Sequence, residues 1–144
     1  MSSSTTSPSQ SGLSARSVLL WPALADVVAV LVFVAIGRNS HEEAWSLSGF
    51  ATTAWPFLAG AAVGWLISAA VDRPLWLPAR ILPAGLIIWV STVVVGMLLR
   101  VVSDQGTALS FCIVASIATA VLLLGWRAIA ALIQGRRAGG PADG

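Results

Sequence analysis

The residue in this sequence that most needs a specific interaction is Asp26, because it is an ionisable side chain inside an apolar stretch of twenty residues, Val18–Gly37. Twenty apolar residues match the length that a helix needs to cross a hydrocarbon core of about 30 Å. A carboxylate in that core costs about 2.5–3.5 kcal/mol on insertion scales, so it needs a partner or a function. Asp26 lies about eight residues, or ~12 Å, from one edge of the core at 1.5 Å per residue.

The sequence offers Arg127 as a partner for Asp26. The last apolar stretch carries Arg127 to a similar or slightly shallower depth as it returns to the same side of the membrane. We therefore predict a buried ion pair between Asp26 and Arg127 that links the first and last helices. In the alternative, the Arg127 side chain extends to the membrane surface, and Asp26 is protonated or hydrogen-bonded to Ser116, Thr119 or water.

A second group of ionisable residues is expected at the other ends of the spans. This predicted outer cluster consists of Arg38, His41, Glu42, Glu43, Arg100 and Asp104. Charges of both signs can bind an anion, a metal or a lipid headgroup, or they can form a solvated rim that ends the helices. Arg38 and Arg100 each close a span on the arginine-poor side, so we expect Glu42, Glu43 or Asp104 as acidic partners.

Catalytic and metal-binding signatures are not found in the sequence, which has no His-Glu-x-x-His, no Cys-x-x-Cys and no phosphate loop. His41 beside two glutamates is a weak metal signal, because three consecutive residues on a helix cannot all face one ion. We therefore expect no cofactor, no metal site and no enzymatic activity, and an enzyme that uses His41 and Glu42 ranks last. The net charge of +2 is too small for a nucleic-acid-binding face.

The elements that position these residues follow from composition. Of the 144 residues, 57% are hydrophobic and only 10% are charged, whereas soluble domains carry about 25% charged residues. The lipid bilayer must therefore be the solvent for most of the surface. We predict an all-α polytopic membrane protein, a bundle of four transmembrane helices at about 18–37, 50–71, 81–100 and 108–133. The serine-rich segment 1–17 is predicted to be disordered, and 135–144 a flexible basic tail.

Two features of the spans stay open. Segment 41–53 is either an interfacial helix or an extended entry to the second span. The first apolar stretch could also be a secretory signal, but it is longer than the 7–15 residues of a signal core and contains Asp26, so an uncleaved span is favoured.

The arginines predict the orientation, because cytoplasmic loops of membrane proteins are enriched in basic residues. Six arginines fall on one side of the spans and two on the other: Arg16, Arg73, Arg80, Arg127, Arg136 and Arg137 against Arg38 and Arg100. We expect both termini in the cytoplasm and a multi-pass protein of the cell (plasma) membrane.

Small residues recur at helical spacing and predict close helix packing. Gly60, Gly64 and Ser68 lie four residues apart on the second span, and Gly96 lies on the third. Small residues let helix backbones approach closely in lipid. Packing within the chain, against the first or third span, is favoured over a seam between two copies, which would make the protein a homo-oligomer.

Four short strings occur along the chain in this order: Gly37-Arg38-x-x-His41, Pro56-Phe57-x-x-Gly60-x-x-x-Gly64-Trp65, Gly96-x-x-x-Arg100 and Gly125-Trp126-Arg127. Their order and spacing resemble a family of small, mostly actinobacterial, four-span membrane proteins known as domain of unknown function 3054. The likeness covers about Leu20 to Arg127. The resemblance implies four membrane spans and draws attention to Asp26, Arg38, His41, Arg100 and Arg127. It implies no activity, substrate or cofactor.

Two functions remain as hypotheses. The first is a non-catalytic membrane component that binds a lipid, a small ligand or a partner protein through the outer cluster and the loop 40–53. The second is a small oligomeric ion- or proton-coupled transporter that uses Asp26. Transport would require a dimer, because four spans enclose only a narrow polar space.

Overall fold

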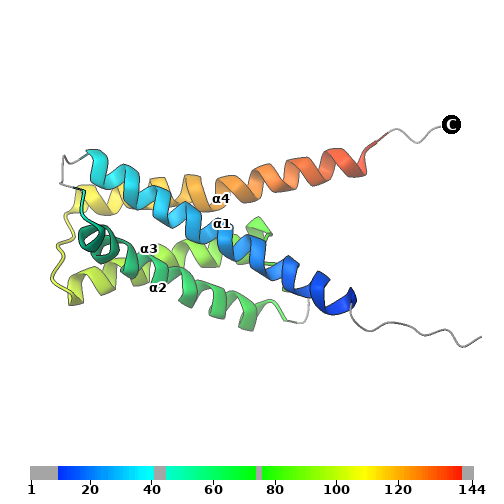
Figure 1. Cartoon of the computed structure of the whole chain (residues 1–144), viewed down its shortest axis with the longest axis horizontal. Coiled ribbons are helices and arrows are strands. Elements are labelled where there is room, and N and C mark those ends of the chain that lie inside the picture. The colour runs from blue at the N-terminus through cyan, green and yellow to red at the C-terminus, as the bar shows by residue number, and fades with distance from the viewer. Residues whose placement is uncertain (1–9, 41–44, 74–75, 141–144) are drawn as a thin grey trace, which may run out of the picture.

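The computed structural model describes residues 10–40, 45–73 and 76–140, and this part of the chain folds into four long helices (Figure 1). They are α1 (Gln10–Ser40), α2 (Leu47–Val71), α3 (Leu86–Val102) and α4 (Leu109–Ala138). A short kinked segment, η1 (Ile81–Gly85), in which Leu82 has an extended backbone, leads into α3. Stretches long and apolar enough to cross a membrane occur in all four, at Arg16–Asn39, Leu47–Val71, Ile81–Val102 and Leu109–Ala138. The predicted all-α, four-span membrane architecture is confirmed.

Helices α1 and α4 extend beyond the spans predicted from hydropathy. α1 begins at Gln10 rather than at 18, and α4 ends at Ala138 rather than at 133. Hydropathy marks only the apolar part of a helix, whereas backbone hydrogen bonds let the helix continue into polar sequence. Residues 10–17 and 135–138, predicted to belong to the disordered and flexible tails, are therefore helical.

The start of α2 bears on the open question about segment 41–53. Ser46 caps the helix, because its side chain accepts a hydrogen bond of 3.1 Å from the backbone N–H of Gly49. Residues 47–53 thus form the first turns of α2 itself rather than a separate helix. Residues 41–44 lie outside the described residues.

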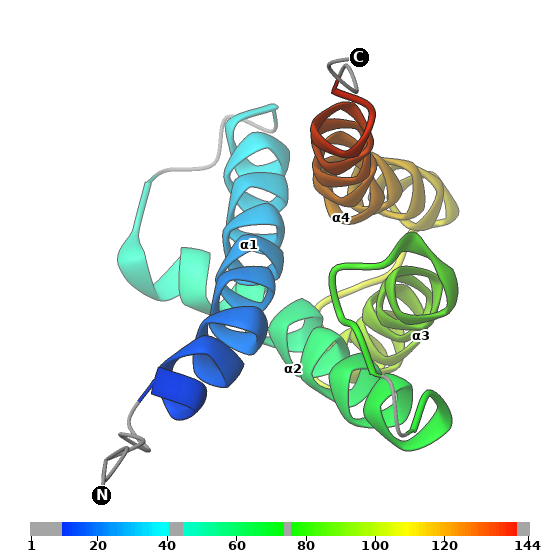
Figure 2. The same ribbon diagram turned by 90° about the vertical axis from the view of Figure 1, so that its right-hand side faces the viewer.

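The two ends of the bundle differ in what they contain. The beginning of α1 and the end of α4 lie at the same end, here named the terminal end, and the α3–α4 loop and the start of α2 lie at the opposite end (Figure 1). Viewed from the terminal end, α1 and α4 stand well apart (Figure 2). Towards the opposite end the core is closed by aromatic rings, with Phe33 and Phe57 in edge-to-face contact at 5.0 Å between ring centroids.

Helices α2 and α3 pack against each other through the predicted small residues. A Cβ atom placed on Gly60 would lie 2.9 Å from backbone atoms of Ser91 and Thr92, and one on Gly64 would lie 2.7 Å from Cα of Ile88. Both distances are too short for any side chain, so the two backbones touch. The small-residue stripe of α2 is therefore covered by α3 of the same chain.

The two remaining packing residues contact aromatic side chains. A Cβ atom on Gly96 would lie 2.8 Å from the ring of Phe57. Ser68 is fully buried, and its hydroxyl oxygen accepts a hydrogen bond of 3.1 Å from Nε1 of Trp76. A larger side chain at either position would collide with the neighbouring aromatic ring.

We expect Gly64→Ala to destabilise the protein by about 1–3 kcal/mol, as for other overpacked cores, because backbone atoms of α3 cannot move aside. The measurement is the thermal unfolding midpoint of the detergent-solubilised protein. Gly125→Ala is the matched control, since nothing lies within 4 Å of a Cβ atom there and alanine favours a helix over glycine. Equal midpoints for the two variants would contradict the packing described here.

Candidate functional site

The centre of the terminal half of the bundle is an ion pair between Asp26 of α1 and Arg127 of α4. Arg127 Nη1 lies 2.6 Å from Oδ1 of Asp26, and Nη2 lies 2.7 Å from Oδ2. The two residues are 1% and 0% exposed, so the pair is fully buried. Two parallel hydrogen bonds between a planar guanidinium and a carboxylate make the strongest form of this interaction.

Two tryptophans complete the surroundings of the Asp26 carboxylate. Trp65 of α2 donates its Nε1–H to Oδ2 at 2.8 Å, and Trp126 of α4 donates to Oδ1 at 2.9 Å. A carboxylate has about four acceptor positions, and Asp26 here accepts four hydrogen bonds. Each carboxylate oxygen is therefore satisfied by one arginine donor and one indole donor.

Arg127 is held by carbonyl groups and by an aromatic ring in addition to Asp26. Its Nε donates to the carbonyl oxygen of Pro78 at 3.1 Å, and Nη1 donates to that of Leu123 at 2.7 Å. The guanidinium carbon lies 4.3 Å from the centroid of the Trp126 ring. A Cβ atom on Gly85 would lie 2.8 Å from Cδ of Arg127, so glycine there leaves room for the arginine stem.

The alternative partners that the sequence offered for Asp26 are engaged elsewhere. The hydroxyl of Ser116 donates to the carbonyl oxygen of Cys112, and that of Thr119 donates to Ala115, both within α4. Arg127 does not extend to the surface, because it is completely buried. The structure thus brings Asp26 and Arg127 together, and the contacts suit a structural role that joins α1, α2, α4 and the segment before η1.

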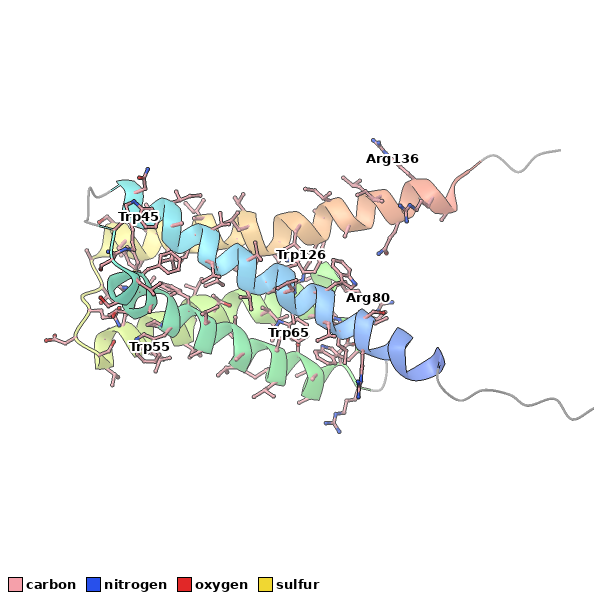
Figure 3. All side chains as sticks on the ribbon, viewed as in Figure 1. Trp45, Trp55, Trp65, Arg80, Trp126 and Arg136 are labelled. Carbon is pink, nitrogen blue, oxygen red and sulfur yellow. The ribbon has the colours of Figure 1, made fainter. Side chains whose placement is uncertain are left out.

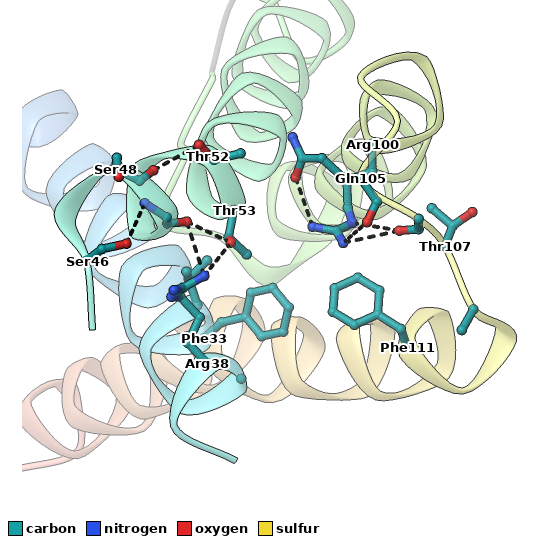
Figure 4. A pocket seen from close by; sticks show the side chains of 15 residues that line it. Phe33, Arg38, Ser46, Ser48, Thr52, Thr53, Arg100, Gln105, Thr107 and Phe111 are labelled. Carbon is teal, nitrogen blue, oxygen red and sulfur yellow. Dashed lines mark hydrogen bonds between the residues drawn. The ribbon is translucent and has the colours of Figure 1, made fainter. Parts of the chain in front are cut away.

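A polar pocket of about 670 Å³ lies at the opposite end of the bundle (Figure 4). Its polar lining comes from α1, the start of α2, the end of α3 and the α3–α4 loop: Arg38, Ser46, Ser48, Thr52, Thr53, Arg100, Gln105 and Thr107. Phe33 and Phe111 also line it, and Figure 4 shows the Phe33 ring beside Arg38 and the Phe111 ring next to Arg100. We name this space the opposite-end pocket.

Neutral oxygen atoms accept hydrogen bonds from both arginines of the opposite-end pocket. Arg38 Nη1 lies 3.3 Å from both the carbonyl oxygen of Gly49 and the hydroxyl of Thr53. Arg100 donates from Nε and Nη2 to the carbonyl oxygen of Gly106, and from Nη1 to Oε1 of Gln105 at 3.1 Å. These contacts hold guanidinium groups from two different helices towards one space.

Arg100 also stacks on an aromatic ring of the pocket. Its guanidinium carbon lies 4.4 Å from the centroid of the Phe111 ring, and the residue is 9% exposed. Because a cation over an aromatic face is attracted by the ring, this contact fixes the position of the charge. The arginine thereby connects the end of α3 with the start of α4.

The predicted outer cluster is only partly assembled in the described residues. Arg38 and Arg100 face the same pocket, whereas Asp104 is exposed in the turn after α3 and does not line it. Asp104 has a φ of 57°, a left-handed conformation that aspartate tolerates in turns. His41, Glu42 and Glu43 lie outside the described residues.

Sequence reasoning missed several residues of both sites. Trp65 and Trp126 are two of them, although an indole N–H inside a span needs an acceptor and Asp26 is the carboxylate available there. The hydroxyl residues of the opposite-end pocket had a signal too, because serine and threonine interrupt the apolar pattern of 45–55. Among the residues that the structure describes, no three metal-binding side chains form a group that could hold a metal ion.

The fold and the buried pair define a class, a small multi-pass membrane protein whose helices are joined by an internal ion pair. Within that class, the chain belongs to the family described as "Protein of unknown function (DUF3054)", which it matches over residues 23–130. This range contains Asp26, Arg38, Arg100 and Arg127. Comparisons with curated proteins and with solved structures gave no match.

We expect Asp26→Asn to lower the free energy of unfolding by about 3–5 kcal/mol, because it leaves the Arg127 charge buried without a counter-ion. The double variant Asp26→Leu/Arg127→Leu should recover part of this loss, since it removes both buried charges. Thermal unfolding in detergent measures the effect, and Arg137→Gln, an exposed site on the same helix, is the control. An Asp26→Asn midpoint equal to that of the control would refute a structural role for the pair.

Proposed function

We propose that this chain is a multi-pass protein of the plasma membrane that binds the anionic group of a lipid or small amphipathic ligand in the opposite-end pocket, without catalysing a reaction. The observation that carries the proposal is the convergence of Arg38 and Arg100, from α1 and α3, on one pocket of about 670 Å³. Its volume falls within the range of small-molecule sites, about 300–1,000 Å³.

The lining of the pocket suits a ligand with a charged and an apolar part. An arginine presents five N–H donors in a planar fork, a geometry that matches carboxylate and phosphate groups. Hydrogen bonds to an ionised acceptor are about twice as strong as those to neutral oxygens, so an anion is a stronger acceptor for these guanidinium groups than the carbonyl oxygens of Gly49 and Gly106. The Phe33 and Phe111 rings offer an apolar surface to the rest of the ligand.

A proton-coupled transporter that uses Asp26 has less support. Such a role requires a carboxylate that exchanges its proton and its partners during the cycle. Asp26 accepts four hydrogen bonds, two from Arg127 and one each from Trp65 and Trp126. If Asp26 left this arrangement, the buried arginine would lose its counter-ion, and the cost of that loss opposes a transport cycle in which Asp26 changes partners.

Binding can be measured by native mass spectrometry with dodecyl phosphate as the anionic probe and dodecyltrimethylammonium as the cationic one. We expect the protein to retain dodecyl phosphate in preference, and Arg38→Gln to weaken its binding severalfold. Arg136→Gln, at the terminal end, is the matched control for loss of one positive charge. Equal retention of dodecyl phosphate by both variants would refute an anion site in this pocket.

The proposed orientation rests on five arginines at the terminal end against two at the opposite end, since basic residues accumulate in cytoplasmic loops. The sixth arginine assigned to that side from the sequence, Arg127, is buried in the ion pair. We expect reporter tags at the N-terminus and at the C-terminus both to signal a cytoplasmic location in intact cells. A tag inserted in the α3–α4 loop should report the outer side. An outer-side signal from either terminus would overturn this orientation.

A further inference from the structure

We propose that a groove at the terminal end, separate from the opposite-end pocket, binds an anionic phospholipid, with an acyl chain between α1 and α4 and the phosphate at Arg80. The groove has a volume of about 510 Å³. Its walls are Val18 and Trp21 of α1 and Ala130 and Ala131 of α4, and the segment 77–82 forms its floor. We name it the terminal groove.

The terminal groove exists because α1 and α4 separate beyond the ion pair. Both helices are continuous through this region and diverge towards the terminal end (Figures 1 and 2). The carbonyl oxygen of Pro78 accepts a hydrogen bond from Arg127, which holds the segment before η1 against α4. The floor of the groove is therefore fixed by the same pair that joins the helices.

The depth of the groove is that of a membrane interface. Trp21 is 45% exposed and contacts the Trp126 ring edge-to-face at 5.1 Å between centroids. Tryptophan is enriched where headgroups meet hydrocarbon, so Trp21 places this part of α1 at that level. Small and aliphatic side chains of α1, α4 and the segment 77–82 line the groove beside Trp21, and an acyl chain can lie against them without leaving an unpaired polar group.

The charge of the groove selects the headgroup. Arg80 lines the groove, is exposed, and lies near the end of the bundle (Figure 3). In the part of the chain that the structure describes, its guanidinium makes no hydrogen bond or ion pair. Basic pockets between transmembrane helices are a known setting for anionic lipid headgroups. Gln134, also in the lining, adds a neutral donor.

Lipid is the occupant that the surroundings favour. The flanking helix faces are apolar and exposed, with Leu20 of α1 and Leu132 of α4 each about two-thirds exposed, so lipid chains surround the mouth of the groove. The exposed arginines Arg73, Arg136 and Arg137 add positive charge to the same end of the protein. Among lipids, this charge favours an anionic headgroup over a zwitterionic one.

Native mass spectrometry of the full chain, with dioleoyl phosphatidylglycerol and dioleoyl phosphatidylcholine added in equal amounts, tests the proposal. We expect the wild type to retain phosphatidylglycerol in preference. Arg80→Gln should reduce this preference about fivefold, the effect of one basic residue near an anionic leaflet. Ala131→Phe should fill the groove and weaken retention of both lipids, and because Ala131 is exposed this variant should fold normally.

Arg73→Gln is the matched control, because Arg73 is exposed at the same end but does not line the groove. Because Arg73 acts on the headgroup only from a distance, this variant should reduce the preference for phosphatidylglycerol much less than Arg80→Gln does. Retention of phosphatidylglycerol that is unchanged in both Arg80→Gln and Ala131→Phe would overturn the proposal. A loss in Arg73→Gln equal to that in Arg80→Gln would also overturn it, since the attraction would then come from net charge and not from the groove.

Discussion

A buried arginine in a membrane protein needs an acceptor for each of its donors, because the hydrocarbon around it offers none, and this requirement explains the terminal half of the bundle. Four N–H donors of Arg127 have acceptors here, two on Asp26 and one each on the carbonyl oxygens of Pro78 and Leu123. Asp26 in turn takes its remaining donors from Trp65 and Trp126. Three of the four long helices and the segment before η1 thus contribute to one charged pair.

The same pair accounts for where the helices pack together and where α1 and α4 separate. Helices α2 and α3 need no charge between them, because glycines at 60 and 64 let their backbones touch. Helices α1 and α4 are joined by the pair and by the apolar core towards the opposite end, and they separate on its other side. The terminal groove and the opposite-end pocket therefore lie on either side of the most constrained part of the bundle.

The sequence was informative where one physical rule decides the outcome. Hydropathy locates the spans because lipid tolerates few charges, and equal depth on antiparallel helices predicted that Asp26 and Arg127 could meet. The sequence was less informative where a buried side chain finds its hydrogen-bond partner in a segment distant along the chain. Nothing local in the chain indicates that the Pro78 carbonyl would reach Arg127, or that Gly85 would leave room for its stem. Asp104, predicted for the outer cluster, is exposed in a left-handed turn and does not line the opposite-end pocket.

The position of the pair also bears on whether the two ends of the protein can communicate. A ligand shifts a conformational equilibrium only by as much as its affinity differs between the two conformations. A rearrangement that separates Asp26 from Arg127 breaks a buried pair, which costs about 3–5 kcal/mol. The ligand's difference in affinity would have to supply this cost as well. Occupancy of the opposite-end pocket is therefore transmitted to the terminal groove only by movements that keep the pair intact, such as bending of α1 or α4 beyond it. The buried pair thus limits coupling between the two proposed sites to the small part that such bending can carry.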